Sequence, residues 1–160
     1  MGLEIVAYAR LKPLRSLTDE ERGCRFLEGH AFLVHPQFPA HAAGVDAELL
    51  YSARETFSFS SGSYSGYVRW LEQLARLVGI ASIDLFWQRP KPGPFRELID
   101  FVDCDATIGA VVCAKLAADF SEYAWRAARH PDSAFKERYS NWKHALEVGA
   151  DRGCVALRIT

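Results

Sequence analysis

The stretch TFSFSSGSYSGYVRWLEQLARLVG, residues 56–79, decides the fold class because the spacing of its apolar residues changes along it. At its start two phenylalanines alternate with serines, which is the period of two of a β-strand. After a run of glycine and serine, apolar residues recur every three or four positions and predict an amphipathic helix over residues 67–78. Ser65 is placed to cap the start of this helix and Gly79 to end it. One strand and one helix therefore follow each other across a short loop.

Similar patterns lie on both sides of this stretch. Alternation over residues 3–12 predicts a half-buried strand that ends at Pro13, with Tyr8 on its polar side. Further strands are predicted at about 26–34, 48–51 and 155–159, amphipathic helices at 108–128 and 133–149, and an extended connector at 80–94. The apolar residues within 95–101 have the spacing of one face of a helix. We expect one α+β domain over residues 1–160, with a mostly antiparallel sheet and about three main helices packed on one face.

Composition excludes several classes of protein. The chain has 160 residues, of which 49% are hydrophobic and 24% are charged. These values are typical of globular domains and exclude wholly disordered, collagenous, coiled-coil and membrane-spanning chains. Nineteen basic residues against twenty acidic ones give a net charge of −1, which argues against nucleic acid as a partner.

The N-terminal residues and the cysteines favour the cytoplasm. Residues 1–4 lack the basic and long apolar regions of a signal peptide. The four cysteines, at positions 24, 104, 113 and 154, are scattered without C-x-x-C spacing, which is typical of reduced thiols. We expect no structural metal, and a buried, unreactive Cys113 on the long helix.

A glycine- and serine-rich loop before the first helix is the main candidate binding site. It consists of Gly62, Ser63, Tyr64, Ser65 and Gly66. Free N–H groups, hydroxyls and the positive end of a helix dipole together favour an anion such as phosphate or carboxylate. The simpler interpretation is a serine-capped turn, since the Walker ending Gly-Lys-Ser/Thr is absent. A second helix start near Thr107 is expected to face the same pocket.

An acidic turn precedes the long helix. Asp103 and Asp105 flank a cysteine, and carboxylates at this spacing can share magnesium or manganese. A third ligand would have to come from Glu97 or Asp119. The competing interpretation is helix capping, with Asp105 or Thr107 as the N-cap.

Other candidate groups carry weaker signals. His30, His35 and His41 lack the spacing of metal ligands and are interpreted as structural or surface residues. Phe86 and Trp87 are adjacent large rings in a proline-bounded segment, so they form an interaction site if exposed and part of the core if buried. Basic residues gather in the last two predicted helices, at positions 126, 129, 136, 138 and 143, and are diluted there by glutamates.

Five segments resemble a family of uncharacterised bacterial and prophage-encoded proteins. They are MGLEIVAYARLK (1–12), GSYSGYVRWLEQL (62–74), GPFRELIDFVDCDATIG (93–109), AKLAADF (114–120) and YSNWKHALEVGADRG (139–153). Together they cover roughly half of the chain. In that family the acidic turn usually reads Asp-x-Glu-Gly and ends in Ile-Gly-Pro, whereas this chain has Asp105, Ala106 and Ala110 there. The resemblance implies a shared fold and an origin in a phage or mobile element, and it implies no activity.

Two hypotheses about function follow. The first is a small cytoplasmic, non-catalytic binding or interaction protein, of the accessory or immunity type that the resemblance implies. Its partner would be another protein or a small anionic ligand. Membrane binding is not expected, and the formation of homo-oligomers is left open. The rival is a metal-dependent hydrolase or phosphate-handling enzyme with the 62–66 loop as anion site. There Asp103, Asp105 and Glu97 would serve as ligands or acid–base groups, with magnesium or manganese as cofactor.

Overall fold

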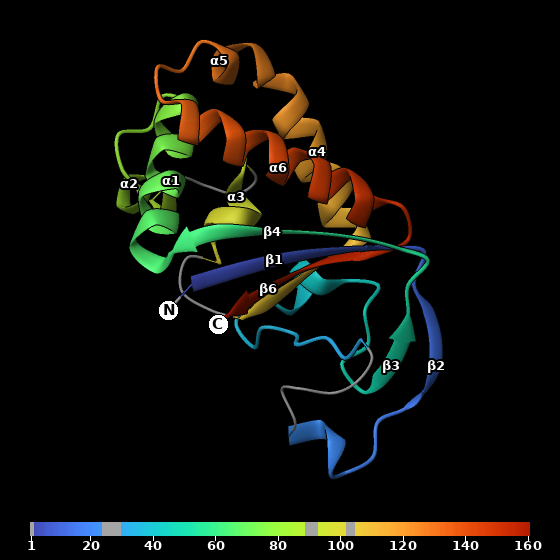
Figure 1. Ribbon diagram of the computed structural model, residues 1–160. Coiled ribbons are helices and arrows are strands. Elements are labelled where there is room, and N and C mark those ends of the chain that lie inside the picture. Colours follow the sequence, from blue (N-terminus) through green and yellow to red (C-terminus); the bar gives the residue numbers. More distant parts are fainter. Residues whose placement is uncertain (1, 24–29, 89–92, 102–104) are drawn as a thin grey trace.

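The computed structural model describes residues 2–23, 30–88, 93–101 and 105–160 (Figure 1). The strands are β1 (Gly2–Ala9), β2 (Lys12–Ser16), β3 (Leu49–Ser52), β4 (Glu55–Ser63), β5 (Ala106–Gly109) and β6 (Cys154–Ile159). The α-helices are α1 (Tyr64–Leu77), α2 (Ile83–Trp87), α3 (Arg96–Ile99), α4 (Ala110–Glu122), α5 (Ala124–Ala128) and α6 (Ser133–Ala150). The 3-10 helices are η1 (Glu21–Gly23) and η2 (Pro39–Ala42).

The larger sheet is antiparallel throughout its described part. Its strands lie in the order β4, β1, β6, β5, and a smaller antiparallel sheet joins β2 to β3. Figure 1 shows α1, α4 and α6 on one side of the larger sheet and the small sheet on the other. The α+β fold predicted from the sequence, with a mostly antiparallel sheet and the main helices on one face, is confirmed.

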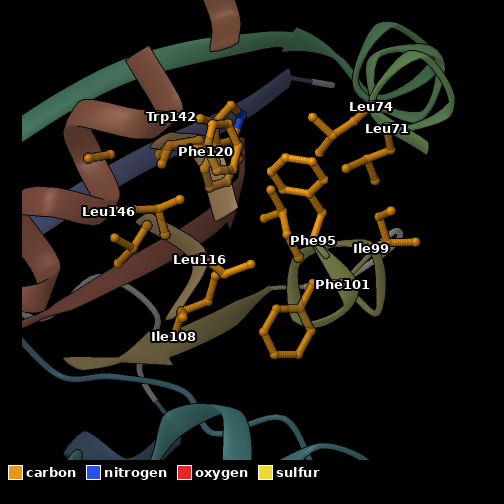
Figure 2. Packing of buried hydrophobic residues seen from close by; sticks show 14 of the residues in the cluster. Leu71, Leu74, Phe95, Ile99, Phe101, Ile108, Leu116, Phe120, Trp142 and Leu146 are labelled. Carbon is orange, nitrogen blue, oxygen red and sulfur yellow. The ribbon is translucent and has the colours of Figure 1, made fainter. Parts of the chain in front are cut away.

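The main core lies between the larger sheet and the helices. Alternate residues of β1, from Leu3 to Ala9, point into it, as the sequence pattern predicted. Leucines, isoleucines and aromatic rings from the helices meet these residues (Figure 2). The rings of Trp70 on α1 and Trp142 on α6 stack at its centre, with centroids 5.8 Å apart. Burial of these rings supplies much of the hydrophobic stabilisation that holds α1 and α6 to the sheet.

The other face of β1 is also covered, which the alternation did not predict. Tyr8 was expected on the polar side, but only 2% of it is exposed. Its ring packs against Phe32, at 5.1 Å between centroids, and belongs to a second apolar cluster with Tyr51. The expectation was wrong because the segment after residue 30 folds back across this face.

The first strand ends earlier than the alternation predicted. β1 stops at Ala9, and Arg10 takes a left-handed φ of 54° before β2 begins. The Arg10 N–H donates to the carbonyl of Asp151 at 2.8 Å, and its guanidinium forms an ion pair with the Asp151 carboxylate. Pro13, predicted to end the strand, lies within β2 instead.

Several other boundaries differ from the predictions. The helix expected at 108–128 starts at Ala110, since residues 106–109 pair with β6, and it breaks at Tyr123 before α5. The connector expected at 80–94 contains α2, capped by the Ser82 hydroxyl. Of the strand expected at 26–34, residues 26–29 lie outside the described ranges, and His30 forms an isolated bridge with Tyr51.

Candidate functional site

The two helix starts predicted to share a pocket lie far apart. α1 begins after Ser63, which is opposite Gly2 in β1, whereas α4 begins after Gly109, which pairs with Cys154 opposite Tyr8. Gly2 and Tyr8 are six residues apart in β1, which is about 20 Å along a strand. The helices also start from opposite edges of the sheet. The predicted common pocket is therefore wrong.

The two residues predicted to cap the long helix have other positions. Thr107 lies inside β5 and is buried, while Gly109 takes the N-cap position of α4. Asp105 precedes β5, and its carboxylate accepts a hydrogen bond from the Ile159 N–H at 2.6 Å. The capping prediction failed because pairing with β6 extends the strand up to Gly109 and delays the helix.

The glycine- and serine-rich loop does form the start of a helix. Ser63, rather than Ser65, is the N-cap: its hydroxyl accepts from the Gly66 N–H at 3.2 Å and lies 3.3 Å from the Ser65 hydroxyl. Arg138 of α6 lies over this loop and donates to the carbonyl of Gly66 at 3.3 Å. A Cβ added to Gly62 would lie 2.8 Å from Arg138 Nη2. The loop thus has its cap satisfied internally and a guanidinium packed on its glycines. Anion binding there, with Tyr64 at its edge, stays a prediction.

The carboxylates proposed as extra metal ligands are held by a lysine. Lys115 Nζ lies 2.7 Å from Glu97 Oε2 and 2.8 Å from Asp119 Oδ2. It also donates to the carbonyl of Gly93 at 2.7 Å. The ammonium pairs with both carboxylates at the place where a metal ion would have to bind. Asp103, the other proposed ligand, lies outside the described residues, and the residues inside them contain no group of three metal-ligating side chains.

A buried ionic cluster, which the sequence patterns did not predict, joins η2 to α3. Asp100 accepts from Arg96 Nε at 3.1 Å and lies 3.0 Å from His41 Nε2, while Arg96 Nη1 donates to the carbonyl of Phe86 at 2.9 Å. The Asp100 side chain is only 1% exposed. The His41 ring stacks on Phe38, with 5.2 Å between centroids. Such a carboxylate fixes the orientation of an imidazole and anchors the segments that carry both groups.

A local signal for half of this cluster was present in the sequence. Arg96 and Asp100 are four residues apart, the spacing that places two side chains on one face of a helix. His41 lies 59 residues before Asp100 in the chain, and no pattern links the two positions. The histidine was interpreted as structural or surface, and its half-buried position beside a carboxylate agrees with the structural interpretation.

The pair Phe86–Trp87 does not form a joint exposed surface. On α2, Phe86 turns into the core and is 2% exposed, while Trp87 is 40% exposed. Phe86 lies under the Arg96 guanidinium, 5.8 Å from its ring centroid. Of the two alternatives, Phe86 therefore belongs to the core, and the two rings differ because successive residues of a helix point in different directions. Trp87 stays accessible.

An aromatic and cationic surface lies on α5, and we call its residues Trp125, Arg126 and Arg129 the α5 corner. Trp125 is 57% exposed, and the two guanidinium carbons lie 5.1 Å and 5.5 Å from its ring centroid. Arg126 also donates to the carbonyl of Leu77 at 3.1 Å. Neither arginine forms an ion pair with a carboxylate of the described residues. The α5 corner combines an exposed aromatic ring with two arginines that form no ion pair within the described residues.

The break at Tyr123 explains why Arg126 forms no ion pair with Glu122. Lys115 and Asp119, and likewise Glu122 and Arg126, are four residues apart, which is the spacing of ion pairs on one continuous helix. The first pair forms at 2.8 Å. The second does not appear, because α4 ends at Glu122 and α5 continues in a new direction. The rest of the predicted basic patch is dispersed, since Lys143 pairs with Glu147 at 2.6 Å and Arg138 covers the 62–66 loop.

Two thiols are expected to resist modification in the folded protein. Cys113 and Cys154 are free and buried, and burial raises the pKa of both thiols, so the reactive thiolate is scarce at neutral pH. Treatment with iodoacetamide followed by peptide mass spectrometry should find both unlabelled in buffer and labelled in urea. Labelling of Cys113 in buffer at the rate seen in urea would contradict the buried position.

Comparison of the chain with known protein families, curated proteins and solved structures gives no match. In the described part of the chain, none of the helices has the length and apolarity needed to cross a bilayer.

Proposed function

We propose that this chain is a small, non-catalytic protein-binding module that uses the α5 corner to hold an acidic segment of another protein. The observation that carries the proposal is the exposure of Trp125 beneath two guanidinium groups. Tryptophan and arginine are the residues that dominate binding energy in protein interfaces. The unpaired charges of Arg126 and Arg129 select a partner that carries carboxylates.

The hydrolase alternative has no comparable support. The 62–66 loop and Thr107 lie on opposite edges of the sheet, and Glu97 and Asp119 already bind Lys115. A protein partner fits better than nucleic acid, because the net charge of the chain is −1. We extend the proposal to a cytoplasmic accessory or immunity-type protein of a phage or mobile element, which the resemblance implies. The free thiols of Cys113 and Cys154 support a reducing compartment.

The test uses a fluorescein-labelled peptide of glutamate and aspartate as the probe. We expect its fluorescence anisotropy to rise with protein concentration at low salt, and the variants Trp125→Ala and Arg129→Ala each to weaken binding by about tenfold or more. Trp87→Ala is the matched control, since it removes another exposed tryptophan from α2, and it should bind like the wild type.

Two results would contradict this function. One is equal binding by the wild type and the Trp125→Ala variant, which would exclude the α5 corner as the binding surface. The other is tighter binding of single-stranded DNA than of the peptide at the same ionic strength, which would indicate a nucleic-acid partner. Circular dichroism of each variant would verify that the fold is retained.

A further inference from the structure

The strand β4 leaves one long edge of the larger sheet open. It has nine residues, Glu55–Ser63, and within the described residues it pairs with β1 alone. Natural proteins protect such edges with lysine, proline or inward-pointing charges. Between its first and last residue β4 has none of these, because its interior reads TFSFSSG. A register shift in its pairing with β1, the kind of irregularity that can also protect an edge, is confined to residues 60–63 at its end. Apart from the Gly62 N–H, which donates to Ser60 Oγ at 3.2 Å, the backbone groups on the open side of the strand are available for pairing with another strand. Figure 1 shows the course of β4 along the sheet.

The two ends of this edge carry opposite charges on the same face. Glu55 is exposed at the start of β4, on the face it shares with Phe57 and Phe59 by strand alternation. Both rings pack against α6, Phe57 on His144 and Phe59 on Trp142. Arg138 projects from the same helix over Gly62 at the other end of the strand. Neither Glu55 nor Arg138 forms an ion pair with the described residues.

We infer that two copies of this chain pair through their β4 edges, antiparallel and about a two-fold axis at Phe59. Antiparallel pairing about such an axis is self-complementary, since each edge offers the other the same row of N–H and C=O groups. In this register Glu55 lies opposite Ser63 of the second copy, next to that copy's Arg138. Two Glu55–Arg138 ion pairs form between the copies, one at each end of the paired β4 strands.

A second copy fits this edge better than a strand from another protein. The pairing needs a positive charge beside Glu55 and a negative charge beside Arg138, and an antiparallel second copy supplies both by symmetry. The edge lies on a different part of the chain from the α5 corner. A dimer built in this way would therefore exist whether or not the corner binds an acidic segment.

Exchange of the two charges tests the inference directly. Sedimentation equilibrium at low salt should find the wild type as a dimer, and Glu55→Arg or Arg138→Glu should each raise the dissociation constant by about tenfold or more, because like charges then meet at both ends. The double variant E55R/R138E restores opposite charges and should return most of the affinity. Added salt should weaken the wild-type dimer.

A second pair of variants tests the edge without touching either charge. Ser58→Lys places a charged side chain in the middle of the open strand and should give a monomer. Ser121→Lys makes the same substitution at an exposed position of α4 and should remain a dimer. A wild type that stays monomeric at all concentrations, a Ser58→Lys dimer, or a double variant no better than the single ones would overturn the inference.

Discussion

Replacement of Asp100 by alanine is expected to lower the free energy of unfolding by about 3–5 kcal/mol, because it breaks a buried ionic cluster from its centre. Asp100 is the carboxylate that Arg96 Nε and His41 Nε2 share, at 3.1 Å and 3.0 Å. Without it the Arg96 guanidinium keeps its charge in a site where little water reaches it. The substitution also releases the contact that ties η2 to α3.

Urea unfolding at neutral pH, followed by circular dichroism, measures this loss. For a chain of this size the melting temperature should fall by about 10 °C or more. Asp84→Ala is the matched control, because Asp84 is an exposed aspartate on α2 without a contact of this kind, and it should change stability by less than about 0.5 kcal/mol. Equal stability of the two variants would mean that the buried cluster contributes nothing to the fold.

Replacement of Trp142 by alanine is expected to cost about 3–5 kcal/mol, since it empties the centre of the main core. The Trp142 ring is fully buried and lies between Trp70, at 5.8 Å, and Phe59, at 5.6 Å. Figure 2 shows it among the buried side chains of the main core. Its loss leaves a cavity that the helix α6 and the strand β4 cannot both move to fill.

Trp125→Ala is the control for this substitution. It removes the same side chain from an exposed position and should leave the free energy of unfolding within about 0.5 kcal/mol of the wild type. If Trp142→Ala fails to fold, Trp142→Phe should fold with a smaller loss, because the indole N–H of Trp142 has no hydrogen-bond partner among the described residues. Similar losses of unfolding free energy in the Trp142→Ala and Trp125→Ala variants would contradict the buried position of Trp142.

Elements with a strong local pattern were predicted closely. The helix expected at 133–149 is α6, Ser133–Ala150, and its cap is Asp132, whose carboxylate accepts from the Ala134 N–H at 2.9 Å. The strand expected at 155–159 is β6, one residue longer. These succeed because capping side chains and periodicity act over a few neighbouring residues.

The candidate site was predicted far less well. Residues 62–66 do form the start of a helix, but their proposed partner Thr107 lies in β5, because pairing with β6 overrides the helical spacing of Ile108. The exposed tryptophan that matters for the proposed function is Trp125, which the sequence placed on a continuous helix. Its exposure follows from the break at Tyr123, and the periodicity of residues 108–128 gave no sign of that break.

By itself the sequence determined the α+β class, the face of β1 that meets the helices, and the position of α1 and α6. Spacing along the chain reports which side of an element is apolar, and this is a property of neighbouring residues. Only the tertiary structure decided that Tyr8 is covered, that His41 meets Asp100, and that the two helix starts lie at opposite ends of the sheet. Those contacts join residues far apart in the chain, so they depend on strand order and register.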